Sequence, residues 1–144
     1  KAILTTTRFG CIGHSICYDL RFAQLYRDLA QAGAEILVCP AAFAVPTGKA
    51  HWHTLNRARA IENGAFMISP CAHGLVSGGG ASYGHSLIVN PWGEILSDGG
   101  DSPGVTVITI DLDLVASTRK RISSLQHDRH YTIQVGELIN RAAE

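Results

Sequence analysis

Two short apolar runs, each preceded by a segment with helical periodicity, constrain the fold of this chain more than any other feature. The runs occupy residues 35–39 and 65–69, and Gly33 and Gly64 end the segments that precede them. An uninterrupted apolar run of this length beside a helix is typical of a parallel strand buried on both faces. Strand, helix and strand of these lengths form βαβ units. The sequence therefore predicts an α/β fold with parallel strands.

Residue preferences and turn residues predict the remaining elements. We expect helices at 19–32, 50–63, 111–121 and 132–142, and further strands at 1–7, 11–17, 85–90, 94–97 and 105–110. Loops are expected at 40–49 and 71–83, and an irregular segment at 122–131. The sequence Asn90-Pro91-Trp92-Gly93 predicts a tight hairpin turn, so the later strands should pair antiparallel. The predicted fold is a layered α/β structure with a mixed sheet.

Composition and charge exclude several classes of partner. The 144 residues fit one domain, and the formal net charge at pH 7 is zero without any run of lysine or arginine, which disfavours nucleic acid. No apolar run approaches the roughly 20 residues of a membrane span, and the first residues do not resemble a secretory signal. The four cysteines form no C-x-x-C pair, as expected for reduced thiols rather than a disulfide framework. We therefore expect a cytoplasmic protein without membrane or nucleic-acid partners.

Cys17 stands at the corner between a predicted strand and a predicted helix. This position places its Sγ atom at the carboxyl edge of the sheet, beside the N–H groups that open the helix. Such N–H groups and the helix dipole favour the nucleophilic thiolate form of a cysteine. The backbone N–H of Tyr18 could stabilise a developing oxyanion. The alternative is an unreactive packing residue, because free cysteines are among the most buried residue types.

The seven histidines are the obvious candidates for a catalytic base or a metal ligand, but none stands in a diagnostic pattern. On a helix, the side chains of His51 and His53 diverge, and no spacing typical of zinc sites is present. We therefore expect no metal site and interpret the histidines as surface or packing residues. A base role for His73 or His85 beside Cys17 remains an alternative. The complete set is His14, His51, His53, His73, His85, His127 and His130.

Charged residues near these segments are interpreted structurally. Arg59 and Glu62 have the i,i+3 spacing of a pair on a helix surface. Asp19 and Arg21 flank the corner and are expected to cap and pair there. The glycines of 78–80 are not followed by the lysine of a phosphate-binding loop, so they predict a flexible loop instead.

Taken together, several segments resemble the nitrilase superfamily, the carbon–nitrogen hydrolases. Residues 13–22, Gly-His-Ser-Ile-Cys-Tyr-Asp-Leu-Arg-Phe, resemble the nucleophile segment of that family. The pocket loop at 40–52, the helix at 57–63 and the hairpin at 83–93 follow in the family's order. The resemblance covers roughly residues 8–131 and is most specific to the Nit-type amidases, a branch that includes deaminated-glutathione amidases and ω-amidases.

The resemblance implies roles for particular residues. Cys17 is the implied nucleophile, the Tyr18 backbone N–H the implied oxyanion donor, and Ala42, Phe43 and Thr47 the implied substrate-binding residues of the pocket loop. The implied reaction is hydrolysis of a C–N bond in a small linear amide through a cysteine thioester, with release of ammonia. The implied fold is an αββα sandwich that assembles into a homodimer or a larger homo-oligomer. Neither a metal nor an organic cofactor is implied.

The resemblance also bears on what this chain lacks. The family's general-base glutamate, a second glutamate and an oxyanion-binding lysine lie upstream of the cysteine, yet no glutamate precedes Cys17 and Lys1 does not fall at the lysine motif. The single methionine is Met67. We therefore expect residues 1–144 to form the C-terminal portion of one hydrolase domain, with the N-terminal part missing and no activity alone. Alternatives are a nitrilase, an N-carbamoyl hydrolase, a glutaminase-type enzyme that uses a histidine, and a non-catalytic binding or scaffold homologue.

Overall fold

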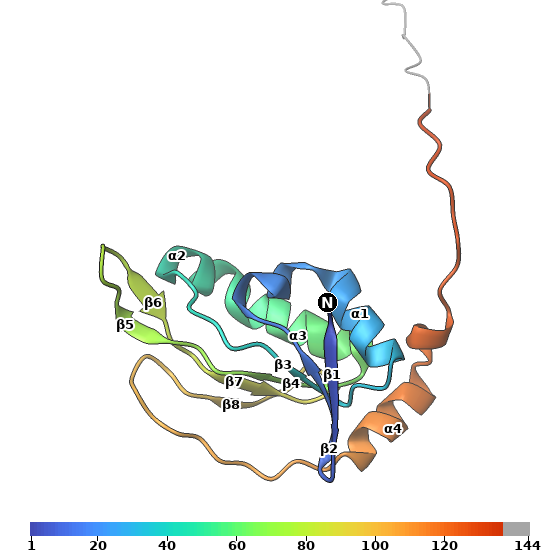
Figure 1. The fold of residues 1–144 in the computed structure, drawn as a ribbon, viewed down its shortest axis with the longest axis horizontal. Coiled ribbons are helices and arrows are strands. Elements are labelled where there is room, and N and C mark those ends of the chain that lie inside the picture. The colour runs from blue at the N-terminus through green and yellow to red at the C-terminus, as the bar shows by residue number, and fades with distance from the viewer. Residues whose placement is uncertain (137–144) are drawn as a thin grey trace, which may run out of the picture.

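A six-stranded mixed sheet forms the centre of the computed structural model, which describes residues 1–136 (Figure 1). The strand order is β1-β2-β3-β4-β7-β8, with β2, β3 and β4 parallel and the other neighbours antiparallel. The prediction of a mixed sheet is therefore confirmed. The strands are β1 (Ile3–Thr7), β2 (Gly10–His14), β3 (Ile36–Val38), β4 (Phe66–Ser69), β7 (Leu87–Val89) and β8 (Ile95–Asp98).

Two consecutive βαβ units build the parallel part of the sheet, as the apolar runs predict. Helix α1 connects β2 to β3, and helix α3 connects β3 to β4. Gly64 ends α3 in the left-handed conformation, with a φ of 52°. The helical elements are η1 (Cys17–Arg21), α1 (Ala23–Gln31), α2 (Val45–Thr47), the π-helical turn η2 (Gly48–Trp52), α3 (His53–Asn63), α4 (Asp113–Arg121) and η3 (Ser124–Gln126). In residues 1–136, no helix has both the length and the apolar character needed to cross a bilayer.

Alternate residues of the strands face two separate cores. Leu37 and Met67 belong to the larger core, which lies beneath α1 and α3 and includes the buried side chains of Tyr26 and Trp52. Ile36 and Phe66 point to the opposite side, where they meet Val115 of α4 and a smaller apolar cluster. This alternation is the period-two pattern of a strand with both faces covered. Figure 1 shows α1 and α3 on one side of the sheet and α4 on the other.

Several predicted boundaries are wrong. The predicted strand at 105–110 has no regular secondary structure and no strand partner in residues 1–136, and Val105 is 92% exposed. The predicted loop at 71–83 contains a second, two-stranded sheet of β5 (His73–Leu75) and β6 (Ala81–Tyr83). The predicted loop at 40–49 includes α2 and the start of η2. The helix predicted at 132–142 lies mostly outside the described residues, and its first five residues are not helical.

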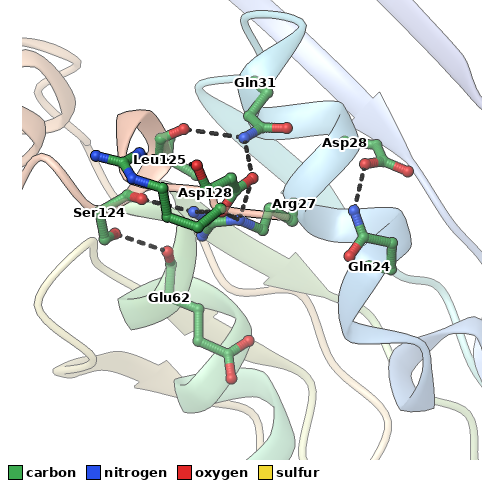
Figure 2. Close-up of polar contacts among 9 residues, drawn as sticks. Gln24, Arg27, Asp28, Gln31, Glu62, Ser124, Leu125 and Asp128 are labelled. Carbon is green, nitrogen blue, oxygen red and sulfur yellow. Dashed lines mark hydrogen bonds and ion pairs between the residues drawn. The ribbon is translucent and has the colours of Figure 1, made fainter. Parts of the chain in front are cut away.

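Polar contacts fasten the segment after α4 to α1 (Figure 2). Arg27 Nε donates to both carboxylate oxygens of Asp128, at 2.8 and 3.1 Å, and Gln31 Nε2 donates to the carbonyl of Leu125 at 2.9 Å. Hydrogen bonds from Arg27 and Gln31 hold the pKa of the Asp128 carboxyl below its usual value. Residues 124–128 of the segment predicted to be irregular at 122–131 are thus held against α1, and they include the 3-10 turn η3.

Gly48 of the pocket loop packs closely against the side chain of Tyr83, and its replacement tests this packing. A Cβ atom at Gly48 would lie 2.3 Å from Cγ of Tyr83, at the root of the ring where the side chain moves least. We predict that Gly48→Ala lowers the free energy of unfolding by about 1–3 kcal/mol, the usual cost of overpacking. Gly104 has open space around its Cα, so Gly104→Ala should change stability far less. Urea unfolding of both variants provides the measurement, and equal effects would contradict the proposed clash.

Candidate active site

Cys17 follows β2 after two residues and is held by the loop that follows β3. Its N–H donates to the carbonyl of Pro40 at 2.9 Å, and its Sγ lies 4.0 Å from the carbonyl oxygen of Ala42. Its own carbonyl accepts a contact from Sγ of Cys39 at 3.8 Å. Since β2 and β3 are parallel, these groups meet at their carboxyl ends, the edge at which α/β proteins bind ligands. Cys17 therefore lies at the carboxyl edge of the sheet, where the sequence predicts it.

The backbone at Cys17 differs from the prediction of a strand running directly into an α-helix. Strand β2 ends at His14, and Cys17 has a φ of 47°, a left-handed value that neither an α-helix nor a strand accommodates. The chain then forms the 3-10 turn η1, and α1 begins only at Ala23. The Asp19 carboxylate stabilises the start of this turn by accepting the Ile16 N–H at 2.9 Å. Cys17 therefore lies at a strained turn rather than at the N-terminus of a long helix.

The strained turn leaves the Tyr18 N–H available. The neighbouring N–H groups of Cys17 and Asp19 donate to backbone carbonyls, whereas no turn or loop hydrogen bond from the Tyr18 N–H is present in residues 1–136. The Tyr18 side chain is 65% exposed, and its ring packs edge-on against Phe22 and beneath the Arg21 guanidinium. A backbone N–H that has no partner, next to a half-buried thiol, can donate a hydrogen bond to a negatively charged oxygen.

Arg59 links the turn at Cys17 to α3. The sequence predicts only its pairing with Glu62, not this link. Its Nε donates to the carbonyl of Leu20 in η1 at 3.0 Å, and its Nη1 donates to Glu62 at 2.9 Å. The predicted pair with Glu62 is confirmed, but Arg59 is buried rather than at the surface. Its guanidinium also lies 5.6 Å from the centre of the Tyr26 ring. Arg59 thereby holds the end of η1 in place.

The two other thiols near this edge are suited to packing rather than chemistry. Burial raises the pKa of the Cys39 thiol, which is fully enclosed, and burial also raises the pKa of Cys71. Ser15 and Tyr26 share a buried 2.6 Å hydrogen bond beneath the same turn. Burial of the phenol and the neighbouring Cys39 raise the pKa of Tyr26. The floor of the site therefore stays uncharged at neutral pH.

The three residues expected to bind substrate occupy different environments. Ala42 is exposed and places its carbonyl beside Sγ of Cys17. Phe43 is buried against Trp52, with ring centres 4.9 Å apart, so it forms the wall behind the loop. Thr47 is half-buried, and its hydroxyl already donates to the carbonyl of Ala44 at 3.1 Å. Of the three, Ala42 is the one in contact with Cys17.

In residues 1–136, no histidine forms a hydrogen bond with the Cys17 sulfur. The one hydrogen-bond partner of that sulfur among residues 1–136 is the Ala42 carbonyl, so neither His73 nor His85 acts on it in this structure. His51 and His53 diverge as predicted: His51 contacts Arg21, and His53 contacts Asp98. His14 pairs with Thr5 across β1 and β2, while His127 and His130 are exposed.

Sequence reasoning missed three features of this edge. A single bridge joins Ala41 to Cys71 and so extends the parallel arrangement past the ends of β3 and β4. The Arg21 guanidinium lies over the Phe43 ring at 5.3 Å instead of pairing with Asp19. His53, His85 and Asp98 meet although they are far apart in sequence. Each of these contacts joins residues that are distant in sequence, so no local sequence pattern predicts it.

Comparisons with known proteins agree with this geometry. Residues 2–120 match the family described as carbon-nitrogen hydrolase. The chain is 46% identical over 119 residues to a deaminated glutathione amidase of Synechocystis, covering 83% of this chain and 44% of that protein. It is 44% identical over 124 residues to the human deaminated glutathione amidase, covering 86% of this chain and 38% of that protein. The chain thus spans less than half the length of these relatives.

Solved structures show the same fold. Saccharomyces cerevisiae Nit3, a member of branch 10 of the nitrilase superfamily, superposes with a TM-score of 0.80 at 32% identity, over 85% of this chain and 45% of Nit3. A variant of the amidase from Nesterenkonia sp. AN1, with the acetamide moiety of fluoroacetamide covalently added at its active site cysteine, gives a TM-score of 0.75 at 26% identity, over 89% of this chain and 44% of the amidase. The predicted fold class and family are both confirmed: this chain belongs to the carbon–nitrogen hydrolase family.

Proposed function

We propose that this chain carries the nucleophile of a thiol-dependent amidase that hydrolyses a small linear amide and releases ammonia. The observation that carries the proposal is the strained turn at Cys17, in which a half-buried sulfur precedes the Tyr18 N–H, a group that makes no turn or loop hydrogen bond in residues 1–136. The similarity to deaminated glutathione amidases and to an amidase modified at its active site cysteine supports the same assignment.

The proposed reaction has two stages. The Cys17 thiolate adds to the amide carbon, and the negative charge that forms on the amide oxygen is stabilised by the Tyr18 N–H. The C–N bond then breaks, the nitrogen takes up a proton and leaves as ammonia, and a thioester remains on the sulfur. Water adds to the thioester carbon, the C–S bond breaks, and the acid is released with the thiolate restored. Ala42 and the loop before α2 form the adjacent wall for the acyl group.

The groups that move protons are proposed to lie outside this chain's sequence. In the nitrilase superfamily, which these segments resemble, a glutamate serves as the base and a lysine assists at the oxyanion, both upstream of the cysteine. No glutamate precedes Cys17 here, and the chain spans less than half of its relatives. The proposed activity is therefore one of the full-length protein, with residues 1–144 as the C-terminal portion of its hydrolase domain. We also propose that the full-length protein is cytoplasmic and assembles into a homodimer or a larger homo-oligomer.

A substrate panel tests the class of reaction. We predict that the full-length protein releases ammonia from small linear ω-amides at least about tenfold faster, in kcat/KM, than from matched nitriles or N-carbamoyl compounds, a difference of about 1.4 kcal/mol in transition-state binding. Ammonia is measured by a coupled assay, and product acids by mass spectrometry. Preference for nitriles would instead identify a nitrilase. Binding of the amides without turnover would identify a non-catalytic homologue.

A further inference from the structure

Three potential metal ligands from separate elements converge beside the pocket loop. His53 begins α3, His85 precedes β7, and Asp98 ends β8. His53 Nε2 lies 2.9 Å from Oδ2 of Asp98, and His85 Nδ1 lies 2.9 Å from Oδ1 of the same carboxylate. One nitrogen from each histidine and one carboxylate oxygen all fall within 4.8 Å of one another. We propose that His53, His85 and Asp98 bind a divalent transition metal of the Zn²⁺ class.

The distances from the Asp98 carboxylate to the two histidines are close to those of a zinc site. Zinc binds imidazole nitrogen and carboxylate oxygen at about 2.0–2.2 Å, which places neighbouring ligand atoms of a tetrahedral site about 3.3 Å apart. Oδ2 of Asp98 lies 2.9 Å from Nε2 of His53 and 3.1 Å from Nδ1 of His85, both close to this separation. The two nitrogens lie within 4.8 Å of each other, so rotation of the imidazole side chains would bring them to one ion. The two imidazole rings meet at 69°, with centres 5.2 Å apart, so they can approach one point without stacking.

The donor set selects among metals. Imidazole nitrogen suits zinc, copper, iron and nickel, whereas magnesium and calcium take oxygen ligands. Two histidines and one carboxylate supply three ligands and leave the remaining positions to solvent. The three side chains are 27–34% exposed, so an ion can enter and a water can complete its coordination. His85 and Asp98 also line a cavity of about 690 Å³ that opens beside them.

The backbone around the three ligands is held firmly. His85 has a φ of 56°, a conformation that L side chains rarely adopt, and its N–H donates to the carbonyl of Gly100 at 2.6 Å. The Gly100 N–H in turn donates to Asp98 at 2.9 Å. The carbonyl of His85 accepts the indole N–H of Trp52 at 2.7 Å, directly before His53 in the chain. These contacts fix the donors' relative positions, as a metal site requires.

A bound ion would link the start of α3 to the segment just before β7 and to the last residue of β8. The metal would therefore stabilise the folded chain in proportion to its concentration and affinity. No spacing in the sequence predicts this site, because His53 and Asp98 are 45 positions apart and His85 and Asp98 are 13 apart. The proposal departs from the expectation of no metal, which rests on local spacing and on the family resemblance, and it does not depend on the proposed amidase function.

Metal titration of the full-length protein tests the site. Zn²⁺ binding is measured by calorimetry and by the shift in thermal unfolding, in a Cys17→Ser background so that the candidate nucleophile contributes no ligand. We expect one equivalent of Zn²⁺ to bind, with affinity reduced more than about tenfold in both His53→Ala and Asp98→Asn, since even outer-shell changes cost about 10–100-fold. Asp98→Asn retains hydrogen-bonding capacity and shape. His51→Ala removes a neighbouring histidine outside the cluster and should bind like the parent.

Co²⁺ substitution identifies the ligands. Visible absorption of four-coordinate Co²⁺ without a near-ultraviolet thiolate band would support the histidine and aspartate site. A thiolate band would overturn it, because the ion would then sit on cysteine. Absence of Zn²⁺ binding in the parent, or unchanged affinity in His53→Ala and Asp98→Asn, would also overturn the proposal and would leave a hydrogen-bonded cluster only.

Discussion

Replacement of Cys17 by alanine should abolish amide hydrolysis in the full-length protein while leaving the fold intact. The variant removes the sulfur that is proposed to form the thioester, so kcat for ammonia release should fall by about 10⁴-fold or more. Alanine retains the Cβ atom, so the strain at a φ of 47° is similar in both proteins. The measurement is ammonia release at saturating amide, alongside thermal unfolding of the same samples.

The matched control is Cys11→Ala, which removes another partly exposed thiol. Cys11 lies in β2, and its sulfur contacts the hydroxyl of Thr6, at 4.0 Å. This control should keep kcat within about twofold, since a surface substitution away from special contacts changes stability by at most about 0.5 kcal/mol. Ammonia release by Cys17→Ala at more than a tenth of the parent rate would contradict the assignment of the nucleophile.

Replacement of Trp52 by alanine should produce the largest loss of stability. Trp52 is fully buried in the larger core, its ring packs on Phe43, and its indole N–H donates to the carbonyl of His85 at 2.7 Å. Truncation of a buried tryptophan costs about 3–5 kcal/mol through lost burial and the cavity that remains. Activity should fall as well, because Trp52 joins the π-helical turn at the end of the pocket loop to α3.

The control for this prediction is Trp92→Ala. Trp92 lies in the hairpin turn between β7 and β8, is 42% exposed and contacts the Arg121 guanidinium at 4.9 Å. Its loss should cost about 1 kcal/mol, the order of one exposed cation–π contact. The free energy of unfolding of each variant is measured in urea. Similar losses for the two tryptophans would contradict the assignment of Trp52 to the core.

The parallel part of the fold was predictable because its signals are local. The apolar runs at 35–39 and 65–69 correspond to β3 and β4, and the tight turn at Asn90–Gly93 joins β7 and β8. The segment at 105–110 shows the limit of such signals. Its β-branched residues favour extended backbone, but a strand also needs a partner, and residues 1–136 provide none. Propensity therefore predicts a strand at 105–110 that the structure does not form.

The details of the site depend on contacts between distant residues. The position of Cys17 follows from the strand before it, but the 3-10 turn depends on the Pro40 carbonyl and on Arg59 from α3. The meeting of His53 with Asp98 likewise needs α3 to pack beside the end of β8. Periodicity along the chain carries no information on these pairs, so only the folded structure brings them together.

The most direct test of Cys17 as nucleophile is the mass of the reaction intermediate. The full-length protein is mixed with a slowly hydrolysed amide, quenched in acid and digested for peptide mass spectrometry. We predict that the peptide containing Cys17 gains the mass of the amide minus ammonia, as a thioester requires, and that hydroxylamine removes this mass. An unmodified Cys17 peptide during active turnover, or an acyl group on another residue, would contradict the account.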